Sequence, residues 1–180
     1  MIAGFAARPL CDEIGDMLSD IEIRPAQVSD IPEVARLVAA LTAYEEALDE
    51  RARYDWDEIR DAPSWLRAVL SRNHHAVWVA DSGKGQLVGH LWVRLYRRRE
   101  GGVPQLSGHI SQAFLEEAWR GKGLMKLMLE DAYQWFRAQN VAVVTLSVLH
   151  RNWVGATAWH RLGFADWREE RRLELKPRRS

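Results

Sequence analysis

The 180-residue sequence has a single cysteine and no long hydrophobic run. One thiol, Cys11, excludes an intramolecular disulfide and a zinc site built on cysteines, and it suits a reducing, cytoplasmic compartment. No apolar stretch approaches the roughly 20 residues that a helix needs to cross a bilayer. Residues 1–20 do not resemble a signal peptide, because Arg8 interrupts a weakly apolar stretch that acidic residues follow. We therefore expect no membrane partner.

Net charge is absent as well, since 25 Lys and Arg residues balance 25 Asp and Glu residues. This balance disfavours a globally basic nucleic-acid binder and a strongly acidic chain. With 47% hydrophobic and 28% charged residues, the composition is that of a globular protein. Domains usually contain roughly 100–200 residues. The sequence therefore predicts one folded domain over residues 21–180, preceded by an N-terminal extension over residues 1–20.

The spacing of apolar residues predicts strands and helices in mixed order. Alternating or β-rich runs predict strands, and apolar residues three and four apart predict helices. We expect strands over 21–24, 76–80, 87–96, 105–115 and 141–148, one or two more over 164–175, and helices starting at Ser29 and Pro63 and over 124–139 and 153–162. Residues 97–104, with three consecutive arginines, are expected to form a loop. A hairpin run followed by a β-α-β unit is typical of a mixed-sheet α/β domain.

The most informative segment is 114–125, where a strand ends, a turn contains Arg120, Gly121 and Gly123, and a helix begins. The first N–H groups of a helix have no partner within it, and with the helix dipole they form an anion site suited to pyrophosphate. Glycines let the backbone approach the phosphates closely. Such turns occur at dinucleotide, nucleotide and coenzyme A sites, and some are only turns. The sequence contains neither GxGxxG nor GxxxxGK[ST], which disfavours the first two.

Three segments together resemble the GNAT superfamily of acyl-CoA-dependent N-acyltransferases. Ile23–Ala26 followed by Ser29-Asp30 is similar to the opening strand and helix of that family. Residues 115–123 are similar to its apolar strand end followed by Arg-Gly-x-Gly, and Asn152, Trp159 and Gly163-Phe164 have the spacing of its closing signature. The resemblance implies the acyl-CoA N-acyltransferase fold, an α/β (α+β) domain whose mixed, mostly antiparallel central sheet is flanked by helices on both faces.

The resemblance also implies which residues bind the cofactor, acetyl-CoA. The turn would present backbone amides to the pyrophosphate, and the strand end before it would bind the pantetheine arm. A backbone N–H near Leu115 would polarise the thioester carbonyl, and Asn152 would contact the cofactor near the pantetheine or the thioester. The cofactor-binding residues expected are Phe114, Leu115, Arg120, Gly121, Lys122, Gly123, Leu124, Met125 and Asn152.

The sequence departs from the family pattern at three places. Met125 stands where the family usually has Gly or Ala, which predicts weaker or adjusted cofactor binding. Trp159 stands where a tyrosine usually protonates the leaving thiolate; an indole N–H donates a hydrogen bond but is no practical acid, so slower chemistry or another proton source is expected. Residues 111–113 carry no acidic residue. A base must then come from elsewhere, and His109 and His150 are the candidates, since a free histidine titrates near pH 6.5; the alternative is that both are packing or surface residues.

A local excess of acidic residues lies between Glu45 and Asp61, where eight carboxylates accompany three arginines. In the family, the corresponding segment usually borders the acceptor entrance. The charge would attract a cationic amine, such as a polyamine, an aminoglycoside or a lysine-bearing peptide; the alternative is a solvated surface. Tyr44, Tyr54 and Trp56 would line an aromatic acceptor pocket or pack against the sheet.

We therefore expect an N-acetyltransferase that moves an acetyl group from acetyl-CoA to a primary amine of a small molecule or peptide, by direct attack in a ternary complex. Leu115, His109, His150 and Trp159 are its expected catalytic positions. One alternative is an acyl-CoA-binding sensor of the same fold with little catalysis, and another is an interaction protein that has lost cofactor binding. We expect no metal and no nucleic acid. The resemblance and the open edges of a mixed sheet are compatible with a homodimer.

Overall fold

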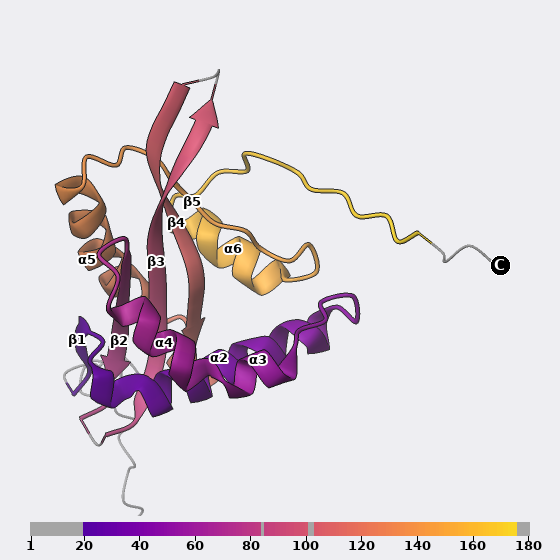
Figure 1. Ribbon diagram of the computed structural model, residues 1–180. Helices are drawn as coiled ribbons and strands as arrows, with labels where there is room; N and C mark the ends of the chain where they lie inside the picture. The colour runs from indigo at the N-terminus through magenta and orange to yellow at the C-terminus, as the bar shows by residue number, and fades with distance from the viewer. Residues whose placement is uncertain (1–19, 84, 101–102, 176–180) are drawn as a thin grey trace, which may run out of the picture.

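The computed structural model describes residues 20–83, 85–100 and 103–175. Its elements in chain order are β1 (Glu22–Pro25), the 3₁₀ turn η1 (Val28–Asp30), α2 (Ile31–Leu48), α3 (Trp56–Arg60), α4 (Ala62–Leu70), β2 (His75–Asp81), β3 (Leu87–Glu100), β4 (Val103–Leu115), the 3₁₀ turn η2 (Glu117–Trp119), α5 (Leu124–Ala138), β5 (Val144–Thr145) and α6 (Trp153–Arg161) (Figure 1). The expected N-terminal extension, except Asp20, lies outside the described residues.

Five strands form one sheet in the order β1-β2-β3-β4-β5. The first three pairings are antiparallel, and β4 pairs with β5 in parallel. A parallel neighbour requires a crossover connection, which α5 supplies between β4 and β5. The β3–β4 hairpin extends well beyond the other strands (Figure 1). The prediction of a mixed, mostly antiparallel sheet is confirmed.

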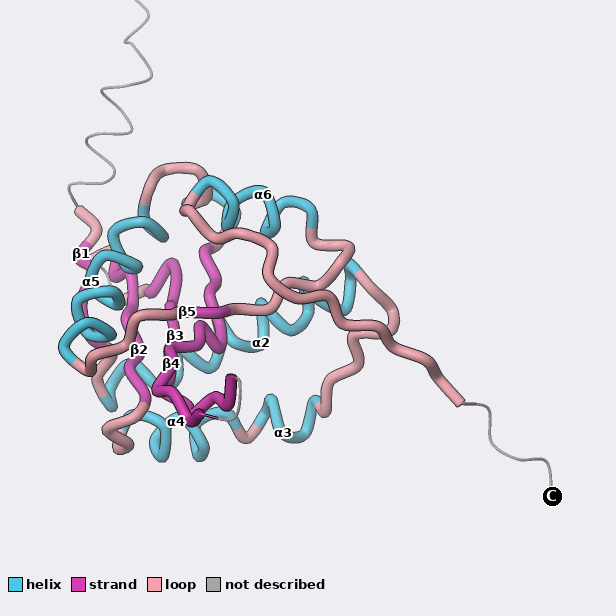
Figure 2. The backbone as a smooth tube through the Cα atoms, turned by 90° about the horizontal axis from the view of Figure 1, so that it is seen from above, coloured by secondary structure: helices cyan, strands magenta, loops and turns pink. Residues whose placement is uncertain are grey.

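Each face of the sheet is covered by its own hydrophobic core. Trp78 and Ala80 face the core under α5, whereas Val79 between them faces the core under α2 and α4. This is the two-residue period of a strand that is buried on both faces. Figure 2 shows the strands between α5 and α6 on one side and α2, α3 and α4 on the other. At the end of β4, the neighbours Phe114 and Leu115 accordingly point into opposite cores.

An ion-pair cluster joins the start of α2 to the edge of the sheet. The Arg24 guanidinium donates to Asp30 Oδ2 at 2.6 Å and to Asp81 Oδ2 at 2.7 Å. Asp30 also accepts from the Gln27 backbone N–H at 2.7 Å. These hydrogen bonds, with that of Arg24 the strongest, hold the pKa of Asp30 below its usual range. The cluster anchors the N-terminal end of α2 at the edge of the sheet. Tyr44 lies further along α2, near the end of β4.

Three expected elements differ in the structure. The arginine-rich residues 97–104, expected as a loop, continue the hairpin, with Arg98 paired to Gln105 and Glu100 to Val103. Arginine tolerates an exposed strand because its long stem packs while its guanidinium stays in water. The strand expected over 141–148 is reduced to Val144–Thr145, because only Gly108 and His109 of β4 pair with it.

The strands expected over 164–175 are not formed in the described chain. This segment runs away from the sheet (Figure 1), with Trp167 and Leu173 exposed. The segment contacts a side chain of β3 and the loop after α2. The Arg98 guanidinium lies 5.9 Å from the Trp167 ring centroid, and the Arg172 side chain donates to the Arg51 carbonyl at 2.8 Å. Alternating residues predicted a strand here, but no strand of the sheet lies alongside to complete its backbone hydrogen bonds.

Candidate functional site

The turn between β4 and α5 is shaped by two glycines in the left-handed region. Gly121 has φ +73° and Gly123, the N-cap residue of α5, has φ +87°. Residues with a Cβ rarely adopt this conformation. A Cβ added at either glycine would meet no atom within 4 Å. Backbone conformation, and not lack of space, therefore calls for glycine, and the surface of the turn is open.

The first turn of α5 directs its amides out of the helix end. The Leu127 N–H donates to the Gly123 carbonyl at 3.2 Å as the first bond of the helix ladder. The N–H groups of Leu124, Met125 and Lys126 precede this bond and point along the helix axis, where the positive end of the dipole lies. Met125 is half-buried and packs against the core beneath α5. The arrangement can bind an anion of the size of a phosphate.

Arg120 fastens this turn to the end of β4 and to α2. Its Nε donates to the Leu115 carbonyl at 2.9 Å. Its guanidinium lies 4.9 Å from the ring centroid of Tyr44 and 5.5 Å from that of Phe114. Lys122, on the same turn, holds its ammonium 5.0 Å from the Trp119 ring centroid. Both cations are thus held over aromatic rings beside the open turn.

Asn152 belongs to the same cluster, although it follows β5. It is the N-cap residue of α6, and its Oδ1 accepts from the Gly155 N–H at 2.8 Å. The Tyr44 hydroxyl donates to the same oxygen at 3.4 Å. A Cβ at Gly155 would lie 2.6 Å from Asn152 Nδ2, so glycine leaves room for this cap. Through Tyr44, the structure brings together the expected cofactor residues Phe114, Leu115, Arg120 and Asn152.

The end of α2 is tied to the start of α6 by Asp49, one of the eight acidic residues between Glu45 and Asp61. Asp49 is buried, accepts from Arg51 at 2.6 and 2.8 Å, and lies 3.7 Å from Arg151 Nε. The hydrogen bonds from Arg51, together with the two cations, hold the pKa of Asp49 well below its usual range. Arg151 directly precedes Asn152, so this contact steadies the loop that positions the amide.

The three other catalytic candidates make their contacts elsewhere. His109 lies six residues before Leu115 on β4, with Nδ1 3.2 Å from Thr145 Oγ1. Burial, and secondarily Arg94, lower the pKa of His109. His150 is exposed and packs edge-on against Trp153 at 5.4 Å. Trp159 packs against Phe164, with ring centroids 5.3 Å apart, and against the core beneath α5. The catalytic roles of these three residues stay predictions.

Tyr54 and Trp56 are fixed by carboxylates of α2. The Tyr54 hydroxyl donates to Glu45 Oε2 at 2.5 Å, and Trp56 Nε1 donates to Glu46 Oε2 at 3.0 Å. Burial, with the hydrogen bond to Glu45, raises the pKa of Tyr54. Tyr44 makes its contacts with Arg120 and Asn152 and so stands apart from the other two aromatic residues. The sequence gives no signal for this division, because Tyr44 and Asn152 are 108 residues apart.

A buried histidine of β3, His90, pairs with Phe114 of β4. It lies close to residues 111–113, where the family pattern has an acidic residue and this sequence has none. His90 is fully buried, and its Nε2 lies 3.3 Å from Gln112 Oε1. Burial lowers the pKa of His90 to about 4. Ser111 occupies the β-bulge opposite Trp92 and Val93, with its hydroxyl buried. His90 is therefore a neutral residue of the core at physiological pH.

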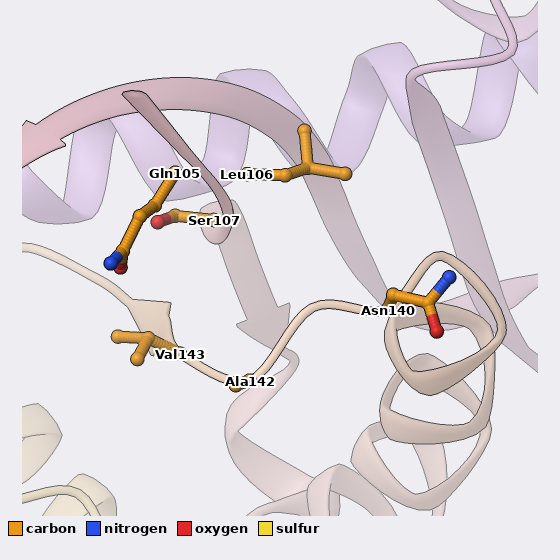
Figure 3. A pocket seen from close by; sticks show the side chains of 6 residues that line it. All are labelled: Gln105, Leu106, Ser107, Asn140, Ala142 and Val143. Atoms are coloured by element: carbon orange, nitrogen blue, oxygen red, sulfur yellow. The ribbon is translucent and has the colours of Figure 1, made fainter. Parts of the chain in front are cut away.

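A hollow lies away from these residues. Gln105–Ser107 of β4 and residues 140, 142 and 143 after α5 surround about 360 Å³ (Figure 3). Figure 3 shows Gln105 and Ser107 on one side of it and Ala142 and Val143 on the other, and its lining carries no charged side chain. Over the described ranges, no cluster of three or more His, Cys, Asp or Glu side chains is suited to a metal ion. Within those ranges, no helix is both long and apolar enough to cross a bilayer.

Comparisons with known proteins show what the chain is similar to. The family model described as "Acetyltransferase (GNAT) family" matches residues 37–164. An uncharacterized N-acetyltransferase from Archaeoglobus fulgidus is 26% identical over 159 residues, which cover 86% of this chain and 95% of that protein.

Two solved structures share the fold. A mutant of the BH1408 protein from Bacillus halodurans aligns with a TM-score of 0.76 at 24% identity and covers 86% of this chain and 99% of its own. A predicted acetyltransferase from Clostridium acetobutylicum, solved with acetyl-CoA, aligns with a TM-score of 0.66 at 20% identity and covers 86% and 96%. The residues that the family model matches include the whole β4–α5 turn and Asn152.

Proposed function

The chain belongs to the GNAT acetyltransferase family, and we propose that it transfers an acetyl group from acetyl-CoA to a primary amine by direct attack in a ternary complex. The observation that carries this proposal is the open turn after β4. Two left-handed glycines there expose the first amides of α5, and Arg120 joins the turn to Leu115 and, through Tyr44, to Asn152.

The residues of the turn fit a coenzyme A pyrophosphate. Backbone amides of residues 121–125 would bind it, and the absence of any atom within 4 Å of an added Cβ at Gly121 or Gly123 leaves room for phosphate oxygens. When bound, acetyl-CoA supplies a thioester whose carbonyl carbon accepts the amine and whose thiol leaves. Phe114, Leu115 and Asn152 would hold the pantetheine arm and the thioester.

The splayed edge of β4 supports this placement. Among the described residues, β5 pairs only with Gly108 and His109, so the stretch 110–115 of β4 has a sheet partner on the β3 side alone. Backbone groups on its free edge can bind the amides of a pantetheine arm, as a strand binds an added strand. An N–H near Leu115 would stabilise negative charge on the thioester oxygen.

Most of the rate acceleration that we propose comes from positioning the two substrates. Direct attack needs a neutral amine held in line with the thioester, and orientation alone contributes several kcal/mol. Burial lowers the pKa of His109, which favours the neutral form that a base requires but weakens its basicity. His109 and His150 remain the candidates for the base.

We further propose that the acceptor is cationic in solution. Glu45 and Glu46 accept hydrogen bonds from neutral donors, Tyr54 and Trp56, so those contacts leave their negative charge uncompensated. Asp49 and Asp57, in contrast, pair with arginines. The remaining negative charge favours approach of a cationic amine at low salt. Polyamines, aminoglycosides and lysine-rich peptides should react faster than amines of equal basicity that carry no further positive charge, and this advantage should shrink as salt is added. Equal rates at low salt would exclude charge selection.

The experiment that tests acetyl transfer is thiol release from acetyl-CoA with a panel of primary amines, with mass spectrometry of the product. A mass gain of one acetyl group on the amine, dependent on the protein, is the expected result. The alternative function, an acyl-CoA sensor, is favoured by one observation: Trp159, which is no practical acid, stands at the position of the expected proton donor. Acetyl-CoA binding without thiol release from any amine would support the sensor.

A further inference from the structure

Tyr44 contacts two residues that are expected to bind the cofactor, but it has no role in the reaction proposed above. Its ring lies under the Arg120 guanidinium, and its hydroxyl reaches Asn152 Oδ1. Arg120 and Asn152 come from the two segments expected to hold the cofactor, one after β4 and one after β5. Tyr44 itself comes from α2. The Tyr44 side chain therefore contacts both of these segments.

The position of the Tyr44 ring is fixed from two sides. Arg120 cannot swing freely, because its Nε is bonded to the Leu115 carbonyl at 2.9 Å. Asn152 is equally constrained, because its Oδ1 caps α6 through the Gly155 N–H at 2.8 Å. The Phe114 ring lies on the same guanidinium at 5.5 Å. The phenol is therefore held in place without its own hydroxyl being strongly engaged.

The hydrogen bond of the Tyr44 hydroxyl is easily exchanged. At 3.4 Å it is well beyond the usual range of about 2.7–2.8 Å for O–H···O bonds. Its acceptor already holds the shorter bond from Gly155. An anionic acceptor placed nearby would form a stronger bond with the O–H group than Asn152 does.

Other donors near the site are less suited to such an acceptor. The Tyr54 hydroxyl is bonded to Glu45 at 2.5 Å, and the Tyr96 hydroxyl lies 3.2 Å from Thr145 Oγ1 on the far part of the hairpin. The Trp159 indole packs edge-on against Phe164 at 5.3 Å, and indole is no practical acid. Tyr44 is the phenol that contacts the expected cofactor residues.

We propose that Tyr44 is the proton donor to the sulfur of departing coenzyme A, an inference that rests on the proposed acetyl transfer. The amine nitrogen forms a C–N bond to the acetyl carbon, the C–S bond breaks, and its electron pair stays on sulfur. The Tyr44 O–H proton passes to that sulfur. The proton that the nitrogen loses on becoming an amide returns to the phenolate oxygen, so the enzyme is unchanged after one turnover.

The first test measures binding and needs no amine. Wild type and Tyr44→Phe are titrated calorimetrically with coenzyme A and with desulfo-coenzyme A, which has no sulfur. A hydrogen bond from Tyr44 to sulfur predicts that wild type prefers coenzyme A by roughly fivefold or more and that Tyr44→Phe loses this preference. Tyr133→Phe, the same change on α5 outside the site, should keep it. An unchanged preference in Tyr44→Phe would overturn the inference.

The second test measures turnover with an amine that wild type acetylates. Tyr44→Phe keeps the ring under Arg120, so acetyl-CoA affinity should stay within about twofold while kcat falls roughly 100-fold, the scale of general acid catalysis. Thermal unfolding of both proteins checks that the variant is folded. Equal kcat values for wild type and Tyr44→Phe would overturn the role of Tyr44 as proton donor and leave the proposed acetyl transfer intact. Wild type that shows the sulfur preference but acetylates no amine would locate the failure in the proposed function instead.

Discussion

At the level of single residues, the turn after β4 depends on backbone conformation more than on side chains. Gly123 holds φ +87° as the N-cap residue of α5, and the space around its missing side chain is open. The amides of the next residues point into this space. A substitution at Gly123 therefore tests the anion site without crowding the protein core.

Gly123→Glu should weaken coenzyme A binding at least tenfold. The new side chain strains a left-handed residue and brings a carboxylate to a site that would bind phosphate. Gly85→Glu is the matched control, because Gly85 has φ +73° and equally open surroundings in the β2–β3 turn. The control should lose a similar amount of stability and no affinity. Unchanged affinity in Gly123→Glu, measured by calorimetry, would place the pyrophosphate elsewhere.

Trp159→Tyr tests the residue at the position of the usual acid. If the indole marks a lost proton donor, the tyrosine variant should acetylate at the wild-type rate or faster near neutral pH, because a phenol can give up a proton. A collapse in steady-state rate, with the thermal unfolding midpoint unchanged, would instead show that the indole shapes the pocket against Phe164.

The sequence indicates these residues unequally. The turn with Arg120, Gly121 and Gly123 is visible in the sequence as a glycine-containing link between a strand and a helix, and Asn152 was expected through the family resemblance; their roles in binding stay predictions. Tyr44 was grouped with Tyr54 and Trp56, and all three were expected either to line an acceptor pocket or to pack against the sheet. Its contacts with Arg120 and Asn152 depend on where α2 crosses the sheet, which no local pattern specifies.

At the level of elements, β4 and α5 position the turn by packing closely against each other. A Cβ at Gly108 of β4 would lie 2.5 Å from the Phe136 ring of α5. Phe136 is 2% exposed and has no room to move aside. The glycine thus allows the helix to approach the strand whose end it follows.

Gly108→Ala should destabilise the protein by about 1–3 kcal/mol, the range for overpacked cores. Urea unfolding measures the loss. Combining it with Phe136→Leu should cost less than the sum of the two single changes, because the smaller side chain makes room for the methyl group. Strict additivity in this double-mutant cycle would contradict the close packing.

Element types were easier to predict than element ends. Helix α5 and the hairpin strands carry strong periodic patterns, and the structure has them. The β-rich composition of 141–148 predicted a longer strand than β5, because composition does not tell how far β4 and β5 stay side by side. Three arginines suggested a loop, but pairing across the hairpin extends β3 through them.

At the level of the whole molecule, one sheet with a core on each face makes stability sensitive to buried polar groups. His90 lies between β2 and β4 with no exposed surface, and within the described chain its Nδ1 has no hydrogen-bond partner. The net charge of zero does not reveal whether an ionisable side chain such as His90 is buried. Burial keeps this imidazole neutral.

The free energy of unfolding should fall as the pH is lowered from about 6.5 to about 4. The unfolded chain protonates His90 near pH 6.5, whereas its pKa in the folded protein is about 4. The difference corresponds to up to about 3 kcal/mol, lost progressively across that window. His90→Gln should flatten this part of the profile, as measured by urea unfolding at several pH values. The pKa values of His75 and His109 are also lowered, so these residues should account for the pH dependence of stability that remains in His90→Gln. Identical slopes in wild type and His90→Gln would exclude the role of His90.

Calorimetric titration of acetyl-CoA into the full chain decides whether the open turn binds the acyl donor. The account predicts a 1:1 complex with a dissociation constant on the order of micromolar, about −8 kcal/mol, which Gly123→Glu weakens and Gly85→Glu does not. A folded wild-type protein that gives no binding heat with acetyl-CoA at millimolar concentration would contradict it, and the fold would then have to serve a function without coenzyme A.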